Sequence, residues 1–154
     1  SEELLAVTGK ALLGNDFESF ARCFYVPHVI ETPDSKTILK TRAALKDIFE
    51  KVVAEYAYLQ VTDLVRFCEI AEFRGPLKIE ATHITHMMSG NLRVKDPFPS
   101  FGVLEFIDDR WQITSSQYAV DQNTHVGRAL HLGIADTNTQ AGSAGTAASD
   151  KRKN

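Results

Sequence analysis

The most constraining feature of this sequence is a change of hydrophobic period close to Tyr58. Before it, the segment after Thr41 carries apolar residues at the spacing that is typical of one face of an α-helix. These residues are Leu45, Ile48, Phe49, Val52, Val53 and Tyr56. After Tyr58, four segments rich in β-branched and aromatic residues are separated by turn signals. They are residues 59–72, 77–89, 100–107 and 111–120. Long strands joined in order by tight turns predict an antiparallel meander.

The first forty residues predict two further helices and a hairpin. Residues 2–13 carry an apolar stripe at helical spacing. Asn15 offers an N-cap for a second helix, which Pro27 is expected to end because proline lacks a backbone donor. Residues 28–32 and 37–40 flank turn-forming residues and predict a short hairpin. The whole pattern is therefore helix, helix, hairpin, helix and meander, which belongs to the α+β class.

Length and composition are those of one globular domain. The chain has 154 residues, of which 44% are hydrophobic and 24% are charged. We expect the domain to span residues 1–135, with a short helix over residues 125–132. Residues 136–154 are polar and small, and cannot bury enough apolar area to offset their ordering entropy. They are therefore expected to form a flexible tail.

Charge and motif content exclude several classes of function. The formal net charge is −3, and the basic cluster Lys151-Arg152-Lys153 is too short to indicate a nucleic-acid partner. No phosphate-binding loop opens a helix, so no cofactor is expected. No apolar run is long enough to span a bilayer, and the acidic start is unlike a signal peptide. We therefore expect no membrane partner and a cytoplasmic location.

The cysteines and histidines give no sign of a metal site. Cys23 and Cys68 lie in apolar runs and are expected to be buried free thiols. His83 and His86 are three positions apart on one predicted strand, so they face opposite sides and cannot hold the same ion. We expect no bound metal.

The order of the elements, together with three local motifs, resembles the NTF2-like superfamily. The motifs are Asn15-Asp16-Phe17-Glu18-Ser19-Phe20 with Pro27-His28-Val29-Ile30-Glu31-Thr32-Pro33, then Lys40-Thr41-Arg42-Ala43-Ala44-Leu45, and Arg110-Trp111-Gln112-Ile113. The resemblance covers about residues 2–121, and the SnoaL-like polyketide cyclase and ketosteroid isomerase groups look nearest. It implies a cone-shaped α+β fold. A curved antiparallel meander would carry three N-terminal helices on its concave face and enclose an apolar pocket. Such a fold hosts many chemistries, so it does not choose among them.

Two mechanisms known in this superfamily lack their residues here. Ketosteroid isomerases use a carboxylate base before the proline that follows the first strand, and a tyrosine and a second acid as an oxyanion hole. The matching positions hold Thr32, Thr8 and Gly102. Limonene-type epoxide hydrolases need an Asp-Arg-Asp relay, whereas Asp63 and Arg66 are expected on opposite faces of one strand. Neither activity is therefore expected.

Strand alternation predicts which side chains face the pocket. In the strand of residues 77–87 the odd positions are the more apolar, so His83 and Thr85 should point inward. His83 and His28 are the candidate catalytic residues, because an imidazole titrates near physiological pH and can transfer a proton. The candidate ligand-binding residues are Thr32, Thr85, Leu104, Phe106, Trp111, Ser115 and Gln117.

These residues predict a pocket for a small, apolar or partly oxygenated molecule. One hypothesis is a cofactor-free isomerase, dehydratase or cyclase in which His83 is the acid or base. The alternative is a non-catalytic dimeric module for ligand binding or assembly, with a filled or inert pocket and His83 as a core residue. The outer sheet face would carry apolar residues on neighbouring strands, which predicts a homodimer through this face. They are Phe101, Val103, Ile107, Ile84 and Met88.

Overall fold

The structure is a computed structural model, and it describes residues 1–119. The helix expected over residues 125–132 and the tail expected over residues 136–154 lie outside the described residues. The helices are α1 (Glu2–Leu13), α2 (Phe17–Ala21) and α3 (Arg42–Tyr58). The strands are β1 (Phe24–Thr32), β2 (Ser35–Leu39), β3 (Asp63–Phe73), β4 (Lys78–Ser89), β5 (Leu92–Arg93), β6 (Phe98–Ile107) and β7 (Arg110–Tyr118).

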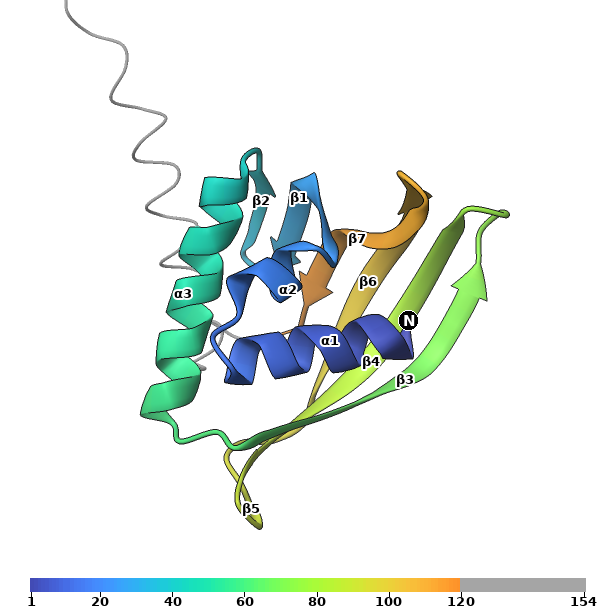
Figure 1. Cartoon of the computed structure of the whole chain (residues 1–154). Coiled ribbons are helices and arrows are strands. Elements are labelled where there is room, and N and C mark those ends of the chain that lie inside the picture. The colour runs from blue at the N-terminus through green and yellow to red at the C-terminus, as the bar shows by residue number, and fades with distance from the viewer. Residues whose placement is uncertain (120–154) are drawn as a thin grey trace, which may run out of the picture.

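The strands form one curved sheet in the order β2-β1-β7-β6-β4-β3, with the short β5 paired to β4. The strands β3, β4, β6 and β7 pair antiparallel in succession, which confirms the expected meander. The hairpin of β1 and β2 joins the same sheet, because β1 pairs parallel with β7. The long strands β3, β4 and β6 sweep away from the hairpin, so the sheet is curved and does not close into a barrel (Figure 1).

All three helices cover the concave side of this sheet, as expected (Figure 1). Helix α1 contacts β3, α2 contacts β1, and α3 contacts β2. Helix α3 begins where the sequence predicts, since the Thr41 hydroxyl accepts a hydrogen bond from the Ala44 backbone N–H at 3.1 Å. Its buried residues are Leu45, Ile48, Phe49, Val52 and Tyr56. They are the apolar stripe seen in the sequence, and they form the core between the helices and the sheet.

The start and length of the second helix differ from the prediction. Its N-cap is Asp16, whose carboxylate accepts a hydrogen bond from the Ser19 backbone N–H at 3.1 Å. Asn15 instead has a left-handed backbone with φ of 53°. The chain is already a strand at Phe24, where the sequence predicts helix as far as Pro27. The cause is the parallel pairing of β1 with β7, in which the Ile113 N–H donates to the Cys23 carbonyl at 2.8 Å.

Two further expectations concern thiols and membrane helices. Cys23 is a buried free thiol as expected, whereas Cys68 is only half-buried, because β3 is an edge strand. Within residues 1–119, no helix is long and apolar enough to cross a membrane.

Candidate ligand pocket

A cavity of about 120 Å³ lies between the three helices and the concave face of the sheet. Its walls are mostly apolar: the helices contribute Leu4, Phe20 and Ile48, and the strands contribute Phe24 and Leu104. An apolar cavity of roughly this size holds one aromatic ring. The cavity therefore has room for a small ring or a short branched chain.

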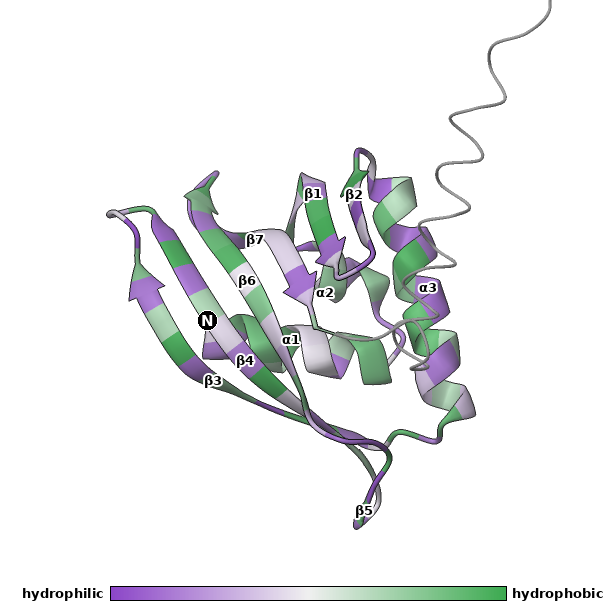
Figure 2. Ribbon diagram, turned by 180° about the vertical axis from the view of Figure 1, so that it is seen from behind, coloured by the Kyte–Doolittle hydropathy of each residue, from purple (hydrophilic) through white to green (hydrophobic). Residues whose placement is uncertain are grey.

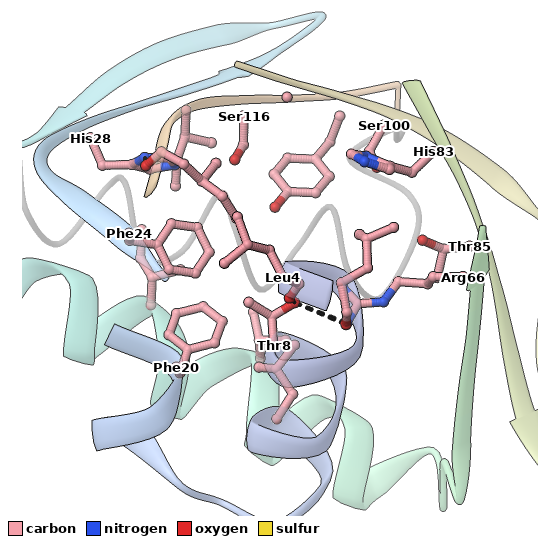
Figure 3. Close-up of a pocket in the computed structure, with 18 of the residues that line it drawn as sticks. Leu4, Thr8, Phe20, Phe24, His28, Arg66, His83, Thr85, Ser100 and Ser116 are labelled. Atoms are coloured by element: carbon pink, nitrogen blue, oxygen red, sulfur yellow. Dashed lines mark hydrogen bonds between the residues drawn. The ribbon is translucent and has the colours of Figure 1, made fainter. Parts of the chain in front are cut away.

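One side of the cavity is polar because of the strand register. Arg66 on β3 lies opposite Thr85 on β4, and His83 on β4 lies opposite Ser100 on β6. Figure 3 shows these four side chains together on one side of the cavity, with His28 and Phe24 on the opposite side. Three neighbouring strands thus gather one charged group, one imidazole and two hydroxyls at the same wall.

Arg66 reaches from the sheet to the first helix. Its Nη2 donates hydrogen bonds to the Leu5 carbonyl oxygen and, at 3.0 Å, to the Thr8 hydroxyl. Helix α1 comes close here because residue 9 is a glycine, and a Cβ at Gly9 would lie 2.6 Å from Nη2. The Nε of Arg66 is buried and has no hydrogen-bond partner among the described residues.

The charge of Arg66 is also without a counter-ion in the part of the chain that the structure describes. Burial lowers the pKa of the guanidinium, but an arginine stays protonated in a protein. The titratable groups that act on its pKa are Tyr56, Tyr118 and Cys23, and none of them is a carboxylate. A cation enclosed in this way normally has an anionic partner.

His83 is buried and largely without partners. It is 7% exposed, and its Nε2 has no hydrogen-bond partner within residues 1–119. Burial and the positive charge of Arg66 lower the pKa of His83 to about 4. The imidazole is therefore neutral at pH 7. Its ring also approaches the backbone of β6, since a Cβ at Gly102 would lie 3.7 Å from its Cε1.

His28 is more completely built into the core. It is 1% exposed, and its ring meets the Phe24 ring edge-on at a centroid distance of 5.0 Å. Its Nδ1 lies 3.2 Å from the Ile113 carbonyl oxygen, so Nδ1 carries the proton and Nε2 is left as an acceptor. Burial lowers the pKa of His28 to about 4.

Two tyrosines complete the polar lining, the buried Tyr56 and the half-buried Tyr118. Burial raises the pKa of Tyr56 to about 12 and also raises the pKa of Tyr118. Both residues line the cavity, and their hydroxyls are neutral at pH 7 and can act as hydrogen-bond donors.

The arrangement of the helices and the sheet is similar to that in several solved structures. An NTF2-like protein of unknown function from Shewanella oneidensis MR-1 has a TM-score of 0.57 and 12% identity, over 77% of this chain and 95% of that chain. One from Pseudomonas putida KT2440 has a TM-score of 0.58 and 10% identity, over 78% and 83%. The chain has the NTF2-like fold. A protein with a cystatin-like fold from Nostoc punctiforme PCC 73102 has a TM-score of 0.59 and 16% identity, over 90% and 86%.

The likeness to these proteins is one of fold. The sequence matches no protein-family model and no curated protein. TM-scores of 0.57 and 0.58 to NTF2-like proteins show the fold that the sequence motifs indicate, and identities of 10–12% carry no activity over to this chain.

The NTF2-like fold brings some of the predicted site residues to the cavity. His28, His83, Thr85 and Leu104 line it. Thr32, Phe106, Trp111, Ser115 and Gln117 are not among the lining residues. The Thr32 hydroxyl shares a 2.7 Å hydrogen bond with the Ser35 hydroxyl at the β1–β2 turn.

Phe106 and Trp111 are paired next to the turn between β6 and β7, outside the cavity lining. Their rings contact each other at a centroid distance of 5.7 Å, and Trp111 also contacts Phe73 at 6.3 Å. They form an aromatic cluster on the same strands as the cavity, but outside its lining.

Ser115 and Gln117 fail to face the cavity because strand β7 contains a bulge. Leu104 pairs with Ile113 and Val103 pairs with Ser115, so one extra residue enters β7 between these pairs. An extra residue shifts the alternation by one, and Ser116 and Tyr118 point into the cavity instead. The sequence gives no signal for this bulge.

Arg66 is the main cavity residue that the sequence does not indicate as a ligand-binding group. Strand alternation places it on the opposite face from Asp63, which excludes an epoxide hydrolase relay but does not by itself point to the cavity. Thr8, at the position of the ketosteroid isomerase tyrosine, is the hydroxyl that holds Arg66. Among the described residues, no group of three or more His, Cys, Asp or Glu side chains is placed to hold a metal ion.

Proposed function

We propose that the protein binds a small, mostly apolar molecule with a few oxygen atoms in this cavity. The observation that carries the proposal is the buried Nε2 of His83, which has no partner and faces apolar walls. An unsatisfied buried polar atom costs about 1–3 kcal/mol. Such a cost is tolerated where a ligand supplies the missing hydrogen bond.

The chemistry that fits is cofactor-free proton transfer, as in the SnoaL-like group that the motifs resemble. At pH 7 His83 is in its base form, since its pKa is about 4. Its Nε2 would take a proton from a carbon next to a carbonyl group, and the electron pair would move to the carbonyl oxygen. Arg66 and the tyrosine hydroxyls would stabilise that oxygen. Return of the proton to another atom would complete an isomerisation. In a dehydration, the electron pair would return from the oxygen, a hydroxyl on the next carbon would leave, and the proton held by His83 would make it water.

His28 would supply a second hydrogen-bond acceptor for the ligand. Its Nε2 is an acceptor on the opposite side of the cavity, and its ring is fixed by Ile113 and Phe24. Thr85 and Leu104 would contact the ligand beside His83.

Binding and proton transfer can be measured on one neutral probe. We expect acetophenone to shift the NMR amide signals of cavity residues, and its methyl protons to exchange with D₂O faster in the presence of the protein. Exchange should be lost in His83→Ala and kept in His86→Ala, a control on the outer face of the same strand. Gly102→Leu should abolish both effects, because its side chain would enter the cavity. Equal shifts in native chain and Gly102→Leu would contradict the proposal.

The exposed outer face of the sheet favours the second candidate function, a non-catalytic dimeric module. Val65 and Phe67 on β3 are each 46% exposed, and Ile70 is 58% exposed. Figure 2 shows the sheet from this side, with apolar and polar residues in turn along β3 and β4. In this alternative a second copy covers the face and the cavity is inert. Absence of acetophenone binding in a protein that sediments as a dimer would favour it.

A further inference from the structure

The groups around Arg66 indicate the charge of the ligand. This inference rests on the proposed binding function. The guanidinium is enclosed by the cavity wall and helix α1, and its two bonded partners, the Leu5 carbonyl and the Thr8 hydroxyl, are neutral. Both bonds come from Nη2, and the buried Nε has no partner in residues 1–119. Buried charges in proteins are paired, because transfer of a lone charge out of water is unfavourable. A counter-ion is therefore the missing element of this site.

A second unpaired atom faces the same cavity. The Nε2 of His83 is buried without a partner, and His83 lies on the strand beside Arg66, two residues before its register partner Thr85. The neutral imidazole has two tautomers: with Nε2 unprotonated it can accept a proton, and with the proton on Nε2 it donates one hydrogen bond. A bound carboxylate selects the second tautomer, so with such a ligand His83 is a binding residue and not the base. Two donors on one wall, one of them charged, match the two oxygens of a carboxylate.

The size and character of the cavity limit the anion further. Arg66 is the one lysine or arginine among the described lining residues, so the lining side chains supply a single positive charge. The remaining walls are mostly apolar, and the cavity of about 120 Å³ holds roughly one ring. A phosphate ester would bring up to two negative charges, and the guanidinium of Arg66 would balance only one of them.

We infer that the ligand is a small apolar monocarboxylate, and that Arg66 binds its carboxylate with one oxygen on Nε and the other on Nε2 of His83. The ring or branched chain of the ligand lies against Phe20, Phe24 and Leu104. Gly9 is a positioning residue for this contact, because helix α1 can hold the guanidinium only where no Cβ occupies its place.

A matched pair of probes tests the charge. Phenylacetate and phenylacetamide have nearly the same shape, and differ in carrying a carboxylate or a neutral amide. At pH 7 we expect calorimetric titration of the full chain to show phenylacetate binding about tenfold tighter or more, the difference that a hydrogen bond to a charged group supplies. Equal affinities for the two probes would overturn the inference and leave the proposed function intact.

Variants then assign the preference to Arg66. We expect Arg66→Gln to remove the preference by weakening phenylacetate alone, and Arg66→Lys to keep part of it. Arg93→Gln, on the exposed strand β5, is the matched control and should change nothing. Gly9→Ala should also weaken phenylacetate, because it displaces the guanidinium without removing its charge. A preference that survives in Arg66→Gln would overturn the inference. Failure of both probes to bind the native chain would overturn the proposed function as well.

Discussion

His28 and His83 are both buried and both have a pKa of about 4, yet their ring nitrogens have different surroundings. His28 is satisfied by the Ile113 carbonyl and by the edge of the Phe24 ring. His83 has an Nε2 without a partner and lies beside an open cavity. The first arrangement stabilises the fold, whereas the second leaves a hydrogen-bonding group available.

This difference predicts different effects of alanine substitution on the free energy of unfolding. His28→Ala should lose about 2–4 kcal/mol, because it leaves a void and an unpaired carbonyl in the core. His83→Ala should change stability by less than about 1 kcal/mol, because it removes an unsatisfied atom and only enlarges an existing cavity. Urea unfolding of both variants beside the native chain measures this. A loss at His83 as large as that at His28 would identify His83 as a core residue.

At the scale of elements, the sequence predicts the helices and strands that are buried on one side only. Burial on one side fixes the spacing of their apolar residues. Helix α3 has one buried side, strand β4 alternates between buried and half-buried residues, and both match the prediction. The meander follows from the turns between long strands. These features depend on local spacing, which a single sequence contains.

The elements that differ from prediction are set by contacts between distant segments. Strand β1 begins early because it pairs with β7, about ninety residues later in the chain. The bulge in β7 reverses the direction of Ser115 and Gln117. On β3 the apolar residues Val65 and Phe67 lie on the exposed face, so hydrophobicity alone would orient Arg66 outward. A polar group in the cavity and apolar groups outside are typical of functional surfaces, where local rules fail.

At the scale of the whole molecule, the buried histidines couple stability to pH. Both pKa values fall from 6.5 in the unfolded chain to about 4 in the folded one, so the unfolded chain binds more protons between these values. Stability therefore decreases as pH falls from about 6.5 to 4. The charged groups acting on His83 are Arg66 and the N-terminal amine, while burial dominates at His28.

We expect His28 alone to account for about 3 kcal/mol of this loss, at about 1.4 kcal/mol per pH unit. Urea unfolding at pH 7, 6, 5 and 4.5 should give a flatter dependence for His28→Gln than for the native chain. The difference between the two curves isolates His28, since all carboxylates are common to both. Parallel curves would mean that folding does not lower the pKa of His28.

The outer sheet face is expected to be a dimer interface, because its exposed apolar residues lie on one continuous surface. Val65, Phe67 and Ile70 are exposed on β3, and the Phe67 ring contacts His86 on β4 at a centroid distance of 5.2 Å. Burial of each such side chain contributes about 1.5–3 kcal/mol, and a twofold axis would use each residue twice.

We therefore expect the native chain to sediment with twice the mass of one chain. Phe67→Lys should sediment as a single chain, since the lysine would place a charge within the contact. Leu92→Lys removes a still more exposed apolar residue near the tip of the β4–β5 turn and should remain dimeric. A native chain that sediments as a monomer would show that this face has another role.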